Sequence, residues 1–414
     1  MSQPHRRRDT CRLCSGGDLV SVLELTPTPP ANAFVGEAAL TTDQPCYPLD
    51  VFFCAGCGHV QLLDVVDPRL LFEDYVYVSG TSPHFVKHFE DYADSVIGRF
   101  KPPAGSLAVD IGSNDGTLLS AFRSRGMEVL GVDPARDIAA RATKSGTETM
   151  AAFFTPNLAA EIRDNRGPAR IVTANNVFAH ADDPKGIVEG VRTLLDPGGV
   201  FVFEVSYLAD VIESTLFDSV YHEHLAYHSL KPLKPFFAAS GMELFAAERV
   251  PTHGGSIRGM AQVSGVPHPA DGSVRDLIAM EERMGLDKAE TYRDFAGRID
   301  KLGQDLKALT AGIKAEGKSI AGFGAPAKAT TLMHHFGLGP ETVDFIVDDS
   351  PLKQGLYTPG HHIPVLPSEA LYQRNPDYVI VLAWNFAEPI MDKHRGFQER
   401  GGRFIVPLPS LEVH

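Results

Sequence analysis

The sequence has no apolar run long enough to span a membrane, few cysteines, and fewer basic than acidic residues. A membrane-spanning helix needs about 20 consecutive apolar residues, so we expect no membrane segment. The Arg6-Arg7-Arg8 triplet has no apolar segment behind it, which predicts that there is no signal peptide. The net charge of −14 argues against a nucleic-acid partner, because phosphate binding needs clustered lysine and arginine. We therefore expect a cytoplasmic protein, and we favour a monomer.

The five cysteines suit a reducing compartment with a bound metal better than disulfide bonds. Four of them form two C-x-x-C pairs, Cys11 with Cys14 and Cys54 with Cys57, while Cys46 is left over. Four thiolates make a closed tetrahedral Zn²⁺ site with no position for water, so this metal would be structural. The alternative is four unrelated buried thiols. We interpret residues 1–70 as a zinc-stabilised module that is too small to hold a core alone.

The most informative stretch is Leu107–Pro134, which predicts a strand, a tight loop, a helix and a second strand. This is half of a doubly wound α/β sheet, with a ligand at the carboxyl ends of the strands. The loop departs from G-x-G-x-x-G, because Asn114 and Asp115 stand between Gly112 and Gly116. Acidic residues there would repel a pyrophosphate, but they suit a positively charged sulfonium nucleoside. The ribose hydroxyls of that nucleoside would donate hydrogen bonds to Asp133, the acid that ends the second strand.

The segment DIGSNDG resembles the S-adenosylmethionine loop of class I methyltransferases. The L-x-P-G-G turn before the strand Val200–Val205 adds to the resemblance, as does the terminal hairpin of Met242–Arg249 and Ser256–Val263. We expect this methyltransferase domain to span residues 71–265. The expected cofactor contacts are Asp110, Gly112, Ser113, Asn114, Asp115, Gly116, Asp133, Pro134, Phe154, Asn175 and Asn176. Of these, Phe154 is equally compatible with a position in the core.

A dense polar motif, Tyr221-His222-Glu223-His224, lies in the segment Ser206–Leu230. H-x-H with a carboxylate could hold a metal ion. Alternatively, a neutral histidine could act as a base beside a tyrosine that faces a developing oxyanion. A third interpretation is polar packing at a domain junction. In a helix Tyr221 would share a face with His224, whereas in a strand it would share one with Glu223, and the sequence does not decide between them.

Other polar groups are expected near the same site. His180 lies at the carboxyl end of the predicted strand Ala169–His180, and that end points at the methyl donor. Tyr75 and Tyr77 precede a predicted helix at His84–Phe100 and are equally compatible with interdomain packing. A predicted turn contains His253, Gly254, Gly255 and Arg258. Its two glycines suit close approach to a polar substrate, although an ordinary turn would explain them equally well.

The carboxyl-terminal part repeats the strand, glycine loop and helix pattern after a long helical stretch, Ser273–Ala315. The loop in Lys318–Thr330 has no acidic residue and carries Lys328, so it suits a diphosphate. We interpret residues 266–414 as a second Rossmann-like domain that binds a nucleotide-linked acceptor. Its expected substrate contacts are Gly324, Ala325, Lys328, Asp348, Lys353 and Asn385.

Taken together, CRLC, CAGC, DIGSNDG, ANNVFAH, YHEH, THGGS and GFGAPAKAT resemble the sugar C-methyltransferases of deoxysugar biosynthesis over essentially the whole chain. The resemblance implies methylation beside the keto group of a nucleotide-linked 4-keto-6-deoxyhexose, with dTDP as the expected nucleotide. It also implies catalytic roles for His224 as base, for Tyr221, Glu223 and His180, and for Tyr75 or Tyr77, with Glu223 orienting or tuning His224. The alternatives are a ketosugar epimerase and a non-catalytic zinc-containing nucleotide-sugar-binding protein.

Overall fold

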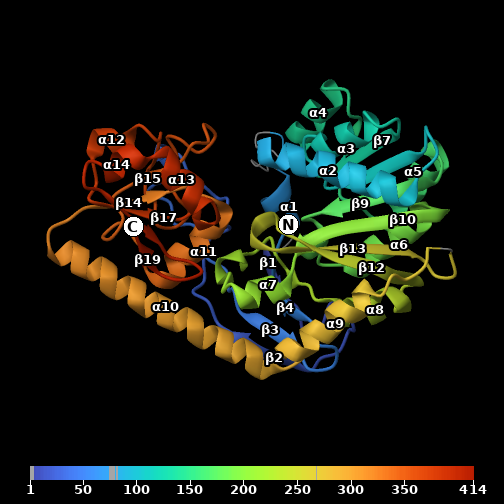
Figure 1. Cartoon of the computed structure of the whole chain (residues 1–414), viewed down its shortest axis with the longest axis horizontal. Helices are drawn as coiled ribbons and strands as arrows, with labels where there is room; N and C mark the ends of the chain where they lie inside the picture. The colour runs from blue at the N-terminus through green and yellow to red at the C-terminus, as the bar shows by residue number, and fades with distance from the viewer. Residues whose placement is uncertain (1–3, 74–79, 81–82, 267) are drawn as a thin grey trace.

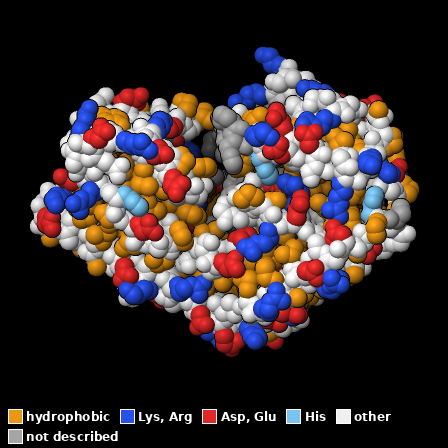
Figure 2. Space-filling model, viewed as in Figure 1, with side chains coloured by type: hydrophobic (Ala, Val, Ile, Leu, Met, Phe, Trp, Pro, Cys, Tyr) orange, Lys and Arg blue, Asp and Glu red, His pale blue; other side chains and the backbone are white. Residues whose placement is uncertain are grey.

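The structure, a computed structural model of the 414-residue chain, describes residues 4–73, 80, 83–266 and 268–414. Two lobes lie side by side, one around a seven-stranded sheet and one around a six-stranded sheet (Figure 1). The long helix α10 (Ala289–Ala315) runs beneath them from one lobe to the other (Figure 1). The space-filling view shows a notch between the lobes on the side opposite α10 (Figure 2).

The seven-stranded sheet has the order β12-β13-β10-β9-β6-β7-β8. Its five strands from β6 to β10 are parallel to their neighbours, and β13 pairs antiparallel with both β10 and β12. This arrangement, with the reversed hairpin at one edge, is the one expected from the resemblance to class I methyltransferases. The bounds are β6 Leu107–Ile111, β7 Glu128–Asp133, β8 Thr149–Ala151, β9 Ala169–Asn175, β10 Leu195–Ser206, β12 Met242–Val250 and β13 Ser256–Val263.

Helices cover both faces of this sheet because β10 is apolar on both sides. Val202 packs into the cluster formed with α2 (Pro83–Phe100) and α3 (Thr117–Arg123). Phe203, the next residue, points the other way, and its ring lies 5.6 Å from the ring of Phe237 on α8 (Leu230–Ala239). Successive side chains of a strand alternate between faces, so a continuous apolar run is what a sheet buried on both sides requires.

The amino-terminal strands β2 (Leu19–Leu23), β3 (Val51–Cys54) and β4 (Val60–Leu62) form an antiparallel ribbon. Its fourth strand was not predicted. It is β11 (Ala226–Tyr227), which belongs to the segment after β10 and pairs with β4. A two-residue strand has no periodicity to recognise, and this one fastens the polar motif at residues 221–224 to the cysteine-containing module. A further pair joins β1 (His5–Arg7) to β5 (Asp64–Val66).

The six-stranded sheet has the order β16-β15-β14-β17-β18-β19, with the last strand antiparallel. The second strand of this lobe in chain order, β15, is regular over only two residues. The bounds are β14 Ile320–Phe323, β15 Ile346–Val347, β16 Val365–Leu366, β17 Tyr378–Val381, β18 Arg403–Val406 and β19 Glu412–Val413. Helix α11 (Ala327–Phe336) begins directly after the glycine loop that follows β14.

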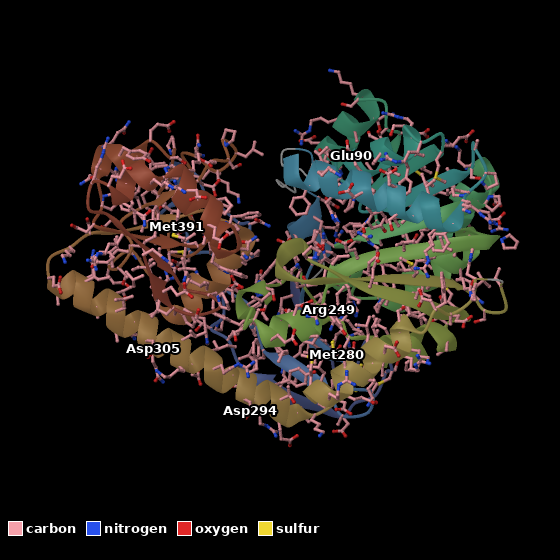
Figure 3. All side chains as sticks on the ribbon, viewed as in Figure 1. Glu90, Arg249, Met280, Asp294, Asp305 and Met391 are labelled. Atoms are coloured by element: carbon pink, nitrogen blue, oxygen red, sulfur yellow. The ribbon has the colours of Figure 1, made fainter. Side chains whose placement is uncertain are left out.

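The predicted helical stretch at 273–315 is two helices, α9 (Ser273–Met284) and α10. Gly285 ends α9 in the left-handed conformation, with φ of 72°, which glycine adopts without a steric penalty. Figure 3 labels Met280 on α9 beside Arg249, whose guanidinium donates to its sulfur, and Asp294 and Asp305 along the outer side of α10. Across the described residues, every helix is too short or too polar to cross a lipid bilayer.

The remaining α-helices are α1 Pro68–Phe72, α4 Arg136–Lys144, α5 Pro156–Arg166, α6 Pro184–Leu194, α7 Leu208–Glu213, α8 Leu230–Ala239, α12 Ala370–Arg374, α13 Ala387–Lys393 and α14 Arg395–Gln398. Short 3₁₀ turns that matter below are η3 Phe178–His180, η4 Phe217–Ser219, η5 Thr252–Gly254 and η6 Trp384–Phe386.

Candidate active site and metal centre

The four paired cysteines converge as predicted. The sulfur atoms of Cys11, Cys14, Cys54 and Cys57 all lie within 4.8 Å of one another, and Cys46 is outside the group. The Cys57 thiol donates to the Cys11 sulfur at 3.7 Å, which lowers the pKa of Cys11 to about 5. Four cysteine sulfurs gathered in this way are the donor set of a closed structural Zn²⁺ site. Among the described residues this is the one cluster so positioned, so the H-x-H motif gains no support as a metal site.

The loop after β6 is shaped for close approach. Gly112 has φ of 71°, and a Cβ atom there would lie 2.2 Å from the Val177 side chain. Asn114 also takes a positive φ, of 49°, and its N–H donates to the carboxylate of Asp133 at 2.8 Å. The second oxygen of Asp133 accepts from the N–H of Ala135 at 2.8 Å. The acid at the end of β7 therefore lies directly against the loop, where the sequence predicted a ribose-binding group.

Two buried carboxylates make this pocket suited to a cation. Asp110 accepts a hydrogen bond from the Thr173 hydroxyl at 2.6 Å, yet burial raises its pKa to about 7, and nearby Asp133 adds to the rise. Burial also raises the pKa of Asp133. The hydroxyl of Ser113 is buried without a partner among the described residues. A ligand with positive charge and hydroxyl groups would stabilise both carboxylates, so these residues fit S-adenosylmethionine.

Other predicted cofactor contacts also form contacts within the protein itself. Asp115 accepts from the N–H and hydroxyl of Thr117 at the start of α3, and from the N–H of Gly80. Gly116 is the N-cap of α3, with φ of 78°. Phe154 packs against Gly190 of α6, where a Cβ would lie 2.8 Å from its ring, so the core alternative describes it better than adenine stacking.

Two predicted contacts, Asn175 and Asn176, stand at the carboxyl end of β9, next to β6 in the sheet. Asn176 takes a positive φ of 54°, and its N–H donates to the Glu204 carbonyl. Pro134 follows Asp133 directly and belongs to the turn into α4.

The polar motif is neither helix nor strand but a turn, in which the His224 N–H donates to the Tyr221 carbonyl at 2.8 Å. The turn brings Tyr221 and His224 together, with their rings 4.0 Å apart. His222 points away, into the amino-terminal module, where its Nε2 donates to the Tyr47 carbonyl. The grouping expected for a helix therefore holds, and burial lowers the pKa of His222 to about 4.

The tautomer of His224 follows from its two neighbours. Its Nδ1 lies 2.7 Å from the carbonyl of Ser219, which can only accept, so Nδ1 carries the proton. Nε2 then holds a lone pair, and it accepts a hydrogen bond from the Tyr221 hydroxyl at 2.9 Å. A neutral imidazole whose Nε2 carries the lone pair is the form that a general base requires. The orienting role of Ser219 could not be predicted, because a backbone carbonyl has no sequence signature.

His180 lies against this pair. Its ring stacks on that of His224 with 5.0 Å between centroids, and the ring of Phe72 also stacks on it at 5.5 Å. Burial, with His224 adding to it, keeps the pKa of His180 well below its ordinary value. Its Nε2 has no partner among the described residues. Tyr75 and Tyr77 lie outside the described residues.

Glu223 is buried, with 2% of its surface exposed, and accepts a hydrogen bond from the side-chain amide of Asn32 at 2.8 Å. The Ser219 carbonyl holds the His224 ring, and the expectation that Glu223 orients or tunes His224 stays a prediction. Asn32 comes from the amino-terminal module, far from the motif in sequence, which is why no pattern pointed to it.

The turn predicted to meet the substrate packs tightly within the protein. Gly255 has φ of 133°, and a Cβ there would lie 2.3 Å from Asp210 on α7. Gly254 lies against Leu216. Arg258 is buried, donates to Glu204 at 2.9 Å and to Glu248, and stacks over Tyr92. This ion pair occupies the guanidinium without any substrate. The side chain of His253 lies outside the described residues.

The glycine loop of the carboxyl-terminal lobe mirrors the cofactor loop. Gly324 has φ of 84°, and the N–H of Ala325 donates to Asp348 at 2.6 Å, as that of Asn114 does to Asp133. Lys353 donates to the Ala325 carbonyl at 2.7 Å. The acid and the lysine predicted to bind substrate therefore hold the loop itself.

Lys328 is placed differently from an exposed phosphate ligand. Its ammonium lies 3.8 Å from the centre of the Trp384 ring, and burial lowers its pKa while Asp218 opposes the shift. The indole N–H of Trp384 donates to buried Asp218 at 2.6 Å, which links η6 to η4. Asn385 follows Trp384 in η6 and is half-buried.

Comparison with known proteins agrees with this arrangement. Family models match three consecutive parts of the chain: a zinc binding domain at residues 11–72, a methyltransferase domain at 85–247, and a C-methyltransferase C-terminal domain at 251–409. Magnesium protoporphyrin IX methyltransferase from Synechocystis, solved with bound S-adenosylmethionine, covers 44% of this chain and 82% of its own, with 15% identity and a TM-score of 0.33.

Two curated relatives match different lengths of the chain. A ubiquinone biosynthesis O-methyltransferase from Paraburkholderia phytofirmans is 31% identical over 125 residues, which is 30% of this chain and 53% of that protein. C-methyltransferase NovU from Streptomyces niveus is 37% identical over 405 residues, which is 98% of this chain and 96% of NovU. Similarity of that extent confirms the expected family: this chain belongs to the S-adenosylmethionine-dependent C-methyltransferases, of the kind that carry a zinc-binding module.

Proposed function

We propose that the enzyme transfers a methyl group from S-adenosylmethionine to the carbon beside the keto group of a dTDP-linked 4-keto-6-deoxyhexose. The observation that carries the proposal is the Tyr221–His224 pair, in which a hydroxyl lies 2.9 Å from a basic imidazole nitrogen. A carbon can accept a methyl group only after it becomes a nucleophile, and a keto group acidifies the hydrogen on its neighbour. The pair offers a base for that hydrogen and a donor for the oxygen that becomes negative.

In this mechanism His224 Nε2 removes the carbon-bound proton, and the electron pair of the C–H bond passes into the enolate. Ser219 holds the proton on Nδ1, so the imidazolium that forms keeps its hydrogen bond to the carbonyl. Tyr221 or neutral His180 donates to the enolate oxygen. Bound S-adenosylmethionine supplies an electrophilic methyl group. Asp110 and Asp133 hold the cofactor side, and the stacked rings of Phe72, His180 and His224 lie on the other.

The acceptor side would use the carboxyl-terminal lobe. Its loop at Gly324 and Ala325 presents backbone beside α11, which suits the nucleotide part of the substrate. Buried Lys328 contributes positive charge at the same helix terminus.

A binding and turnover experiment tests the proposal. The purified enzyme is titrated with S-adenosylmethionine by calorimetry and then incubated with dTDP- and UDP-linked 4-keto-6-deoxyhexoses. Mass spectrometry should show one added methyl group on at least one dTDP-linked sugar. Cofactor binding without any methylated nucleotide sugar would contradict the acceptor assignment, and absent cofactor binding would contradict the whole proposal.

A further inference from the structure

The amino-terminal module reaches the polar motif through the segment Thr28–Val35. This segment leaves the ribbon, bridges Tyr47 at Thr28, and bridges Tyr357 of the carboxyl-terminal lobe at Val35. Between these anchors the amide of Asn32 donates to the carboxylate of Glu223 at 2.8 Å. Since Glu223 lies between His222 and His224, one side chain of the module touches the centre of the motif.

Helix α11 holds both partners of this contact. Thr330 donates its hydroxyl to the carbonyl of Ala31, the residue before Asn32, at 3.0 Å. Thr331 donates to the carbonyl of Val220, the residue before Tyr221, at 2.6 Å. Both threonines are buried, with 6% and 0% of their surfaces exposed. Two adjacent residues of one helix therefore fix the backbone on each side of the contact.

We propose that Asn32 is a positioning residue of the methyl-transfer site, which holds the Glu223 carboxylate in place and is itself held by Thr330. The inference rests on the proposed function, because it takes Glu223 as part of the catalytic group. An amide N–H to a carboxylate is a charge-assisted hydrogen bond, and it fixes direction as well as distance. The module with the cysteine cluster thus contributes to the chemistry as well as to the fold.

The first test compares Asn32 with Gln44, a residue outside the segment that contacts it. Asn32→Leu keeps the size of the side chain and removes the donor. Gln44→Met removes the donor to the carbonyl of Ala33, at 2.8 Å, and the acceptor of the Gly360 N–H, without touching Glu223. We expect Asn32→Leu to lower kcat and the exchange of the substrate's α-proton by about 100-fold, the cost of a misplaced reacting group. The KM for the sugar and the affinity for S-adenosylmethionine should stay unchanged, and Gln44→Met should resemble the wild type.

A double-mutant cycle decides whether Asn32 acts through Glu223. The loss caused by Asn32→Leu should largely disappear when Glu223→Gln is already present, because coupled residues are not additive. Additive losses, or equal losses in Asn32→Leu and Gln44→Met, would show a structural role and overturn the inference. The wild-type enzyme tests the proposed function separately. If it methylates no dTDP-linked ketosugar in the panel, the proposed function is overturned rather than the role of Asn32.

The supporting role of Thr330 has its own matched control. Thr330→Val should lower kcat in the same direction as Asn32→Leu and should be non-additive with it. Thr310→Val removes a buried hydroxyl that donates to Leu306 within α10, so it reproduces the loss of stability at a distance from the site. If both valine variants lower kcat equally at matched thermal stability, Thr330 does not hold Asn32.

Discussion

The ring of His180 lies on the ring of His224, with 5.0 Å between centroids and 24° between planes. His180 ends η3 at the carboxyl edge of the parallel sheet, whereas His224 belongs to the segment inserted after β10. The stack therefore joins the edge where the cofactor loop lies to the residues that hold the basic nitrogen. A methyl donor and a proton acceptor must meet on one carbon atom, and this contact brings their elements together.

His224→Ala should abolish methyl transfer and also the exchange of the substrate's α-proton with deuterated water. Loss of a general base costs about 10²–10⁴ in rate while both ligands still bind. His222→Ala is the matched control, because His222 donates to the Tyr47 carbonyl and faces away from the site. NMR of the substrate in deuterated water measures exchange directly. Normal exchange in His224→Ala would transfer the role of base to Glu223 or His180.

Stability should fall as the pH drops below about 6.5. Burial lowers the pKa of His222 and of His228 to about 4 in the folded protein, from 6.5 in the unfolded chain. Between these values the unfolded chain binds more protons, so the free energy of unfolding rises with pH, by up to about 1.4 kcal/mol per pH unit for each histidine. Urea unfolding at several pH values measures the slope. His228→Leu should give a shallower slope than the wild type, and an identical slope would contradict the assignment.

The cysteine cluster should hold one zinc ion per chain. Cys54→Ser should lower zinc content and thermal stability, because binding of a structural zinc contributes to folding. Cys46→Ser is the control, since the Cys46 thiol is exposed and lies outside the cluster. Elemental analysis and thermal unfolding report the two effects. Equal behaviour of the two variants would show that the cluster does not bind metal.

Asp133→Ala should weaken S-adenosylmethionine by about 1.5–3 kcal/mol, the contribution of a hydrogen bond to a charged group. Asp348→Ala provides a matched control, because Asp348 holds the equivalent loop of the other lobe at Ala325. Calorimetry should find the cofactor affinity unchanged in that variant. Cofactor binding that is weaker in Asp348→Ala than in Asp133→Ala would exchange the roles of the two lobes.

Local patterns in the sequence were sufficient for much of the fold. The apolar run of β6, the glycine loop and the helical spacing of α3 are all encoded within Leu107–Arg123, and the terminal hairpin likewise depends on neighbouring residues. The cysteine pairs were recognisable because a tetrahedral site restricts spacing. In contrast, Gly285 ends α9 through a single left-handed residue, which a long helical periodicity conceals.

The site depended more on contacts between distant segments. The turn at Tyr221 is set by the pairing of β11 with β4 and by the carbonyl of Ser219, neither of which has a local signature. Asn32 reaches Glu223 across 191 positions of sequence. Arg258 was a reasonable substrate ligand by its charge, but a buried carboxylate, Glu204, already pairs with it.

Transfer of a carbon-13 methyl group from labelled S-adenosylmethionine tests the central claim most directly. The product formed from a dTDP-linked 4-keto-6-deoxyhexose is examined by carbon–proton correlation NMR. The account predicts that the labelled methyl is bonded to the ring carbon next to the ketone, and that this carbon has lost its original proton. A labelled methyl on oxygen, or on a carbon that is not adjacent to the ketone, would contradict the enolate mechanism.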